Sequence, residues 1–342
     1  MSLTRLLALA VVTVLAVACA TAAPPPPEPT TAAPPAPAVE RAPEVFESDR
    51  WIVTVARAGD TAESLAQRHL GDAGKAWMIE DYAGKQTFAE GQEIVIPKKD
   101  WNVAGVTPSG YALVPILTYH NIGLESKGRM VLGVKKFEEH MRYLRAEGYR
   151  VLSLRRFIEA MTMRRQLPRK SVVITFDDGY KSFRQYVAPL LKELGFTATL
   201  FVYLDYVGGG RNALSWQDLK ELAADGFDVQ AHSKTHGDLR RGAREPEAQY
   251  AQRMERELGQ PLSRLRQHIG PADALAYPYG YWDENLLRQV RQHGYVAGFT
   301  VRRQANPVFV APFQINRSQI YGEMTLDEFI RNLNVFHAEE IK

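Results

Sequence analysis

The feature that most constrains the fold is an alternation of strand-like and helix-like segments from about residue 110 onward. Short apolar runs predict strands at residues 113–119, 171–176, 197–203, 228–231, 275–277, 295–300 and 314–317. Amphipathic segments between them predict helices at residues 183–194, 216–224, 245–265 and 284–292. Parallel strands need long crossovers, which such helices supply, so the alternation predicts a mainly parallel α/β sheet. About seven such units favour a barrel, complete or incomplete, with its chemistry at the C-terminal ends of the strands.

Two adjacent carboxylates, Asp177 and Asp178, follow the strand predicted at 171–176, at the expected functional end. Neighbouring carboxylates raise each other's cost of ionisation unless a cation relieves it. One of the pair is therefore suited to bind a metal, and the other to act as a base. The following Gly179 leaves an ordinary turn as the alternative.

Two imidazoles, His232 and His236, follow the strand predicted at 228–231. Nitrogen ligands together with a carboxylate oxygen suit zinc or a similar divalent metal. With Asp178 they predict a three-ligand site that leaves positions open for water, which is the arrangement of catalytic metal sites. A lone His232 would more often be a structural, hydrogen-bonded histidine.

Taken together, residues 175–179 (TFDDG) and 232–236 (HSKTH) resemble the polysaccharide deacetylase family, also called the NodB homology domain or carbohydrate esterase family 4. The resemblance spans about residues 110–325 and implies an α/β fold, an incomplete (β/α) barrel of the NodB type. It implies metal ligation by Asp178, His232 and His236, with Asp177 as the catalytic base. The implied cofactor is a divalent metal, Zn²⁺ first and Co²⁺ or Ni²⁺ as alternatives.

A third family motif corresponds to residues 276–280 (AYPYG), and the resemblance implies that the backbone N–H of Tyr279 faces a developing oxyanion. Many members carry Arg where Ala276 stands, and that Arg positions the base. We expect Arg317, at another predicted strand end, to take this role for Asp177. A structural or surface arginine is the alternative.

Typical members end with a strand that bears a general-acid histidine, whereas His337 lies here in a helix-like pattern. The strand predicted at 113–119 instead leads into His120. This arrangement resembles the circularly permuted branch that acts on poly-N-acetylglucosamine, so we expect His120 to be the general acid, with a packing role as the alternative. Substrate stacking is expected from three aromatic residues that could equally belong to the core: Tyr180, Trp216 and Tyr281.

The N-terminal region predicts export. Arg5, an apolar run at 6–18 and Cys19 resemble a lipoprotein-type signal peptide over residues 1–19, with an incidental cysteine as the alternative. Cys19 is the one cysteine of the chain, so no intramolecular disulfide can form. Residues 20–50 are rich in Pro and Ala and predict a linker.

Residues 51–98 predict a small α+β module that precedes the deacetylase domain at 110–342. A strand at 51–55, a turn at 59–61, two helices beginning at 62 and near 77, and a strand at 93–97 resemble the LysM module, a glycan-binding fold. A structural subdomain without a ligand is the alternative.

These features predict an exported hydrolase that removes N-acetyl groups from an N-acetylglucosamine polymer, either poly-N-acetylglucosamine or peptidoglycan. The expected partners are that polymer, peptidoglycan through the LysM-like module, and a membrane through the lipid on Cys19. The expected location is the bacterial cell envelope, with the periplasm or outer membrane for a Gram-negative source. The net charge of +3 is too small to argue for nucleic acid. A wall-binding lipoprotein with an inactive barrel and an acetylxylan-type esterase remain the alternatives.

Overall fold

The computed structural model describes residues 45–340. The predicted signal peptide, Cys19 and most of the predicted linker lie outside this range. Within residues 45–340, no helix has the length and apolar character needed to cross a bilayer.

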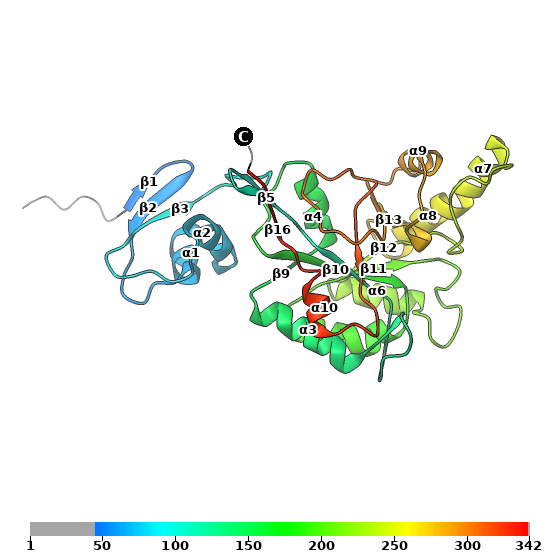
Figure 1. Cartoon of the computed structure of the whole chain (residues 1–342), viewed down its shortest axis with the longest axis horizontal. Coiled ribbons are helices and arrows are strands. Elements are labelled where there is room, and N and C mark those ends of the chain that lie inside the picture. The colour runs from blue at the N-terminus through cyan, green and yellow to red at the C-terminus, as the bar shows by residue number, and fades with distance from the viewer. Residues whose placement is uncertain (1–44, 341–342) are drawn as a thin grey trace, which may run out of the picture. The chain divides into compact units, whose positions relative to one another are not determined.

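A parallel sheet forms the centre of the larger region (Figure 1). Its strand order is β14-β13-β12-β11-β10-β6-β15, and β9 pairs with the first residues of β10. The strands are β6 (Ile116–Tyr119), β9 (Arg150–Leu152), β10 (Ser171–Asp178), β11 (Thr199–Val202), β12 (Asp228–Ala231), β13 (Ala274–Ala276), β14 (Ala297–Phe299) and β15 (Ser318–Gln319). All pairings between them are parallel. The crossovers between most of them contain helices, which is the α/β arrangement that the alternation predicts.

Strand β10 shows how the two faces of the sheet differ. Val172 and Ile174 pack into the core between sheet and helices. Val173, which points the other way in a strand of period two, packs inside the curled sheet with residues such as Phe201 and Phe299. The next inward positions are polar, Thr175 and then Asp177, and both are buried. The interior is therefore apolar at one end and polar where the strands end.

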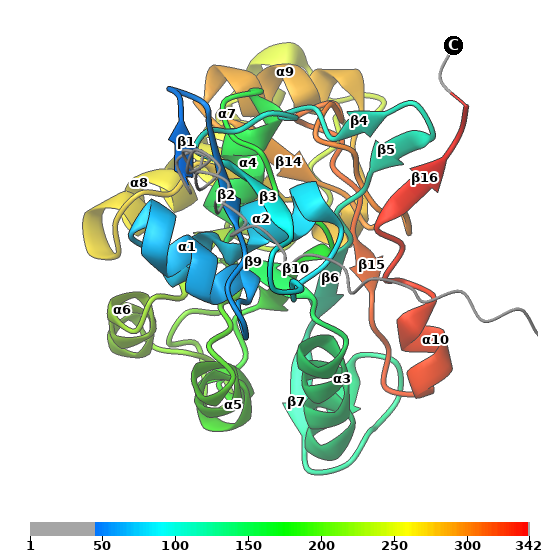
Figure 2. The same cartoon turned by 90° about the vertical axis from the view of Figure 1, so that its left-hand side faces the viewer.

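The sheet curls until one segment contacts both of its edges. Ile315 exchanges backbone hydrogen bonds with Gly298 and Thr300 beside β14, and Ser318–Gln319 pair with β6 on the opposite edge. The fold is thus an incomplete (β/α) barrel, as expected, and residues 315–319 bridge its seam. Figure 2 shows β15 beside β6.

Helices cover the outside of this sheet (Figure 2). They are α3 (Val134–Ala146), α4 (Leu154–Met161), α5 (Ala188–Glu193), α6 (Trp216–Ala224), α7 (Glu247–Met254), α8 (Gln260–His268), α9 (Glu284–Gln292) and α10 (Leu326–Ile330). Two π-helical segments lie between or before them, η2 (Phe183–Val187) and η3 (Glu255–Gly259), and a 3₁₀ turn, η4 (Pro278–Gly280), follows β13. Helix α6 begins at a capping box in which Ser215 and Asp218 satisfy each other's backbone N–H groups.

The N-terminal module has its own small core. An antiparallel sheet of β1 (Val45–Glu47), β2 (Trp51–Val55) and β3 (Glu93–Pro97) packs on α1 (Ala62–Leu70) and α2 (Ala76–Ala83), and a 3₁₀ turn η1 (Ala73–Lys75) joins the helices. The order β2-α1-α2-β3 is the one read from the sequence. Strand β1 lies in residues assigned to the linker, which is a correction at that boundary.

Short strands outside the barrel change two further expectations. They are β4 (Val106–Thr107), β5 (Gly110–Ala112), β7 (Asn121–Gly123), β8 (Val131–Gly133) and β16 (Phe336–Ala338). His337 lies in β16, which pairs with β5, so the helical reading of this segment is wrong. The strand predicted at 314–317 is displaced to Ser318–Gln319, because within residues 311–317 only Ile315 forms a bridge, to Phe299.

Candidate active site

Three side chains meet at the C-terminal ends of β10 and β12. The Nε2 atom of His236 lies 3.4 Å from Oδ1 of Asp178, and Nε2 of His232 lies 3.7 Å from the same oxygen. One ligand atom from each residue falls within 4.8 Å of the others. Tetrahedral ligands at about 2.0–2.1 Å from zinc would be about 3.3 Å apart, so this spacing suits one ion.

The tautomer of His232 also suits a metal. Its Nδ1 lies 2.7 Å from the carbonyl oxygen of Ala276, which can only accept a hydrogen bond. The proton is therefore on Nδ1, and the lone pair of Nε2 faces Asp178. Metal-binding histidines are commonly oriented by such a bond to a backbone carbonyl. Burial lowers the pKa of His232 to about 4, which favours the neutral imidazole that a metal needs.

Asp178 needs a cation for a further reason. Its Oδ1 atom is buried and has no hydrogen-bond partner among the described residues. Burial, opposed by the charge of His120 and reinforced by that of Asp177, raises the pKa of Asp178 to about 6. An orphaned carboxylate oxygen aimed at two imidazoles fits a divalent metal, which would satisfy it.

The second carboxylate, Asp177, forms a buried ion pair with Arg317. The two guanidinium nitrogens donate to its two oxygens at 2.7 and 2.8 Å. The Arg317 side chain is fully buried, and its Nε donates to the carbonyl oxygen of Thr300. Burial alone would raise the pKa of Asp177, but the charge and hydrogen bonds of Arg317 outweigh it and hold the pKa at about 2. Asp177 is therefore ionised at neutral pH and fixed in orientation.

The backbone is strained where these side chains converge. Of the six non-glycine residues with positive φ among residues 45–340, four lie here: Asp178 (76°), Ser233 (72°), His236 (62°) and Tyr279 (60°). Each such conformation costs about 1–3 kcal/mol and persists only where the surroundings enforce it. Their concentration at one end of the barrel marks this end as functional.

His120 follows β6, the strand next to β10, and is half-buried. Its charge lowers the pKa of both Asp177 and Asp178, which puts it near the carboxylate pair. Strand β6 lies between β10 and β15 in the sheet. The role of His120 as general acid stays a prediction.

Aromatic rings lie around the candidate metal ligands. Tyr203 lies 5.2 Å from His236, ring centroid to centroid, and stacks on Tyr206 at 5.3 Å. On the other side, Tyr279 lies 4.9 Å from His236 and 5.8 Å from Tyr281. Both rings of this second pair are about half exposed. They could therefore contact a ligand, whereas Tyr203 and Tyr206 are partly buried.

The predicted stacking residues have different positions. Tyr180 lies beside Asp178, whose charge acts with burial to raise the pKa of Tyr180. Tyr281 is exposed, with the guanidinium of Arg240 4.4 Å above its ring. Trp216 instead packs its ring on His268, 4.7 Å away, outside this chain of rings. Packing in the helical layer accounts for that position.

Sequence reasoning missed three residues around the site. Tyr203 and Tyr206 follow β11, so the rule that function gathers at strand ends could have found them. Glu257 accepts hydrogen bonds from the loop that carries the histidines. In the sequence it lies within a segment predicted as an amphipathic helix, where a glutamate is expected to be exposed. No local pattern distinguishes it.

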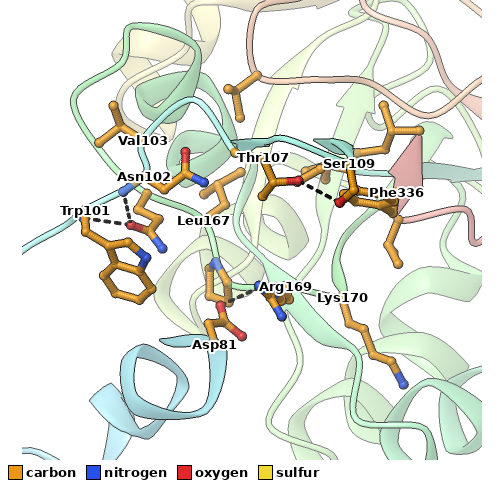
Figure 3. A pocket seen from close by; sticks show the side chains of 18 residues that line it. Asp81, Trp101, Asn102, Val103, Thr107, Ser109, Leu167, Arg169, Lys170 and Phe336 are labelled. Atoms are coloured by element: carbon orange, nitrogen blue, oxygen red, sulfur yellow. Dashed lines mark hydrogen bonds between the residues drawn. The ribbon is translucent and has the colours of Figure 1, made fainter. Parts of the chain in front are cut away.

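A separate cavity of about 580 Å³ lies at the other end of β10 (Figure 3). Its wall includes residues 168–170, which precede the strand, together with Trp101 and Leu167. The backbone N–H of Arg169 donates to Asp81 there at 2.8 Å. Asp178 is at the far end of the eight-residue strand β10, so this cavity is not part of the candidate metal site.

Comparison with known proteins agrees with this geometry. Residues 164–298 match the family described as Polysaccharide deacetylase. The "Putative polysaccharide deacetylase YxkH" of Bacillus subtilis is 30% identical over 232 residues, covering 68% of this chain and 80% of that protein. The poly-beta-1,6-N-acetyl-D-glucosamine N-deacetylase of Staphylococcus epidermidis is 25% identical over 178 residues, covering 50% of this chain and 61% of that protein.

Solved structures share the barrel. The deacetylase PplD of Streptococcus pyogenes, determined with acetate, superimposes with a TM-score of 0.59 at 23% identity, covering 65% of this chain and 98% of that one. IcaB from Ammonifex degensii gives a TM-score of 0.56 at 25% identity, covering 66% and 96%. These likenesses establish the incomplete barrel as the fold.

Proposed function

The chain belongs to the polysaccharide deacetylase family, and from that premise we propose that it is a metal-dependent N-deacetylase of an N-acetylglucosamine polymer. The observation that carries this proposal is the convergence of Asp178, His232 and His236 beside an ion-paired Asp177. A base held apart from a three-ligand site suits metal-assisted hydrolysis of an unreactive amide.

The reaction adds water to the acetamide carbonyl and breaks its C–N bond, giving acetate and a free sugar amine. A divalent ion at the three ligands would supply Lewis-acid polarisation and lower the pKa of water to about 7. Asp177, kept ionised by Arg317, accepts the proton of the attacking water. The backbone N–H of Tyr279 donates a hydrogen bond to the developing oxyanion.

His120 completes the proton balance. The departing amine needs a proton, and His120 follows β6, the strand beside β10, near enough for its charge to lower the pKa of Asp178. In this proposal it donates that proton, a step that typically contributes about 10²–10⁴-fold to the rate. Arg317, which touches Asp177 and not the reacting atoms, is a positioning residue.

The proposed substrate is poly-β-1,6-N-acetylglucosamine or a related N-acetylglucosamine polymer. Two observations support a glycan: the exposed rings of Tyr279 and Tyr281 flank the metal ligands, and relatives named for this substrate cover the same domain. Aromatic faces suit sugar rings because they offer broad apolar contact with a polar edge.

The decisive experiment measures acetate released from β-1,6- and β-1,4-linked N-acetylglucosamine oligomers and from peptidoglycan, with the zinc-loaded protein. Asp177→Asn is the test variant. Asp225→Asn is the matched control, because Asp225 is half-exposed and pairs with Lys192. We expect release with wild type and control and almost none with Asp177→Asn. Equal release by all three proteins would remove Asp177 as the base, and no release from any N-acetylated glycan would reject the proposed activity.

The proposal extends to the N-terminal region. We infer that residues 51–98 are a LysM-like module that docks the enzyme on peptidoglycan, and that a lipid on Cys19 and the linker tether it in the cell envelope. The support for the module is its β2-α1-α2-β3 order and its separate core. Retention of residues 51–98 on purified peptidoglycan tests docking, and a labelled fatty acid tests Cys19. Absence of either signal would reject the corresponding part.

A further inference from the structure

The loop that carries the metal-binding histidines cannot hold its own shape by regular secondary structure. Residues 232–236 follow β12 and contain two of the left-handed residues, Ser233 and His236. Inside the loop, one bond links the N–H of His236 to the hydroxyl of Ser233 at 2.9 Å. The two backbone N–H groups between these residues point outward and need a partner elsewhere.

A single buried carboxylate supplies that partner. Oε2 of Glu257 accepts from the N–H of Thr235 at 3.0 Å and from that of Lys234 at 3.2 Å. Its Oε1 accepts from the Thr235 hydroxyl at 3.0 Å. Glu257 is only 8% exposed, although it belongs to a helix on the outside of the barrel. One side chain therefore satisfies three donors of the ligand loop.

The helix is irregular where it makes this contact. Helices α7 and α8 are separated by the π-helical segment η3, whose central residue is Glu257. A π-bulge inserts an extra residue and rotates the side chains around it, and such bulges are frequent at functional sites. Here the irregularity coincides with the residue that reaches the loop.

We propose that Glu257 is a positioning residue for the metal: it fixes the loop at 232–236 so that both imidazoles face Asp178 before an ion binds. The inference rests on the proposed function, since it concerns the same metal site. Glu257 acts through the backbone of Lys234 and Thr235, and it touches neither the ion nor the substrate. Such outer partners typically contribute about 10–100-fold to metal affinity.

The test compares zinc affinity in the full chain, by competition with a chromogenic chelator. Glu257→Gln keeps the side-chain size and removes the charge and one acceptor. Its matched control is Glu255→Gln on the same π-helical segment, where the side chain is 70% exposed and pairs with His293. A second variant, Thr235→Val, nearly keeps the volume and removes the hydroxyl, which donates to Glu257 and accepts a longer bond from the N–H of Gly237 at 3.3 Å.

We expect Glu257→Gln to weaken zinc binding about 10–100-fold and Thr235→Val to weaken it less, with Glu255→Gln unchanged. The zinc-induced rise in melting temperature should shrink in the same order, whereas the metal-free melting temperatures stay close to wild type. That split separates positioning from a purely structural role, which would lower the metal-free stability and leave the affinity of the folded protein intact.

Two outcomes would overturn the inference. One is a zinc affinity of Glu257→Gln equal to that of Glu255→Gln. The other is a loss of metal-free stability that accounts for the whole effect. Failure of the wild-type protein to bind zinc would instead refute the proposed metal-dependent function, so the two failures are distinguishable.

Discussion

His140 provides a quantitative test of how the barrel's core responds to pH. It lies on α3, is 1% exposed, and stacks on Phe329 with ring centroids 3.9 Å apart. Its Nδ1 is 3.4 Å from the hydroxyl of Tyr119, which is also buried. Burial, with a smaller contribution from the charge of Lys136, lowers the pKa of His140 to about 4. The imidazole is therefore neutral in the folded protein at every pH above that value.

The sign of the effect follows from the unfolded chain, where the pKa of histidine is about 6.5. Below pH 6.5 His140 is protonated in the unfolded chain but stays neutral in the folded chain, so the free energy of unfolding decreases as the pH falls from 6.5 towards 4. With these two values, the loss between about pH 7.5 and pH 5 is about 2 kcal/mol from this one residue.

Urea unfolding of wild type and His140→Gln in the presence of a chelator measures this difference. Glutamine is neutral throughout the range and keeps a polar group near Tyr119. Other groups titrate in both proteins, so the comparison isolates His140. We expect the free energy of unfolding of wild type to fall by about 2 kcal/mol more than that of the variant between about pH 7.5 and pH 5. Equal pH dependence would refute the argument from burial.

Three further predictions concern the active site. Arg317→Lys removes the bidentate contact with Asp177 and should lower kcat by about 100-fold with little change in KM, because the base loses its orientation. Adding Ala276→Arg should restore part of the lost kcat in the acetate assay. An unchanged kcat for Arg317→Lys would contradict the positioning role. Gly280→Ala should lower the melting temperature and the activity together, since φ is +73° and a Cβ would lie 2.4 Å from a methyl of Val301; an unchanged melting temperature would show that the turn adapts. With free zinc at about 100 times its Kd, removing the zinc should lower the free energy of unfolding by about 2.7 kcal/mol. Calorimetry with and without chelator measures this difference, and identical unfolding curves would show that the protein binds no zinc.

The sequence predicted the features that local pattern determines, namely the bounds of helices and the residues at the ends of strands. Helices α6 and α9 begin and end where the amphipathic spacing predicts them, and in the structure Ser215 and Asp283 cap their N-termini. The ends of β10 and β12 place Asp178 and His232 at one rim, because parallel strands align their carboxyl ends.

The sequence was less informative where partners lie far apart along the chain. Glu257 and the histidine loop are brought together by the packing of a helix over the barrel, and no spacing encodes that contact. Residues 336–338 read as helix because their pattern is short, and pairing with β5 overrides the local preference. Trp216 was a candidate because an aromatic ring near a barrel mouth can stack on a sugar, but in the structure its ring packs on His268 of α8.

The seam of the barrel makes the geometry of the site depend on a segment that is synthesised well after the signature motifs. Both signature motifs are complete by residue 236, yet the cation that ionises the base arrives with Arg317 in the bridging segment 315–319. A fragment ending before residue 317 would keep every metal ligand and leave a buried carboxylate without its counter-charge. In the proposed mechanism, hydrolysis would therefore begin only after the barrel has joined its two edges.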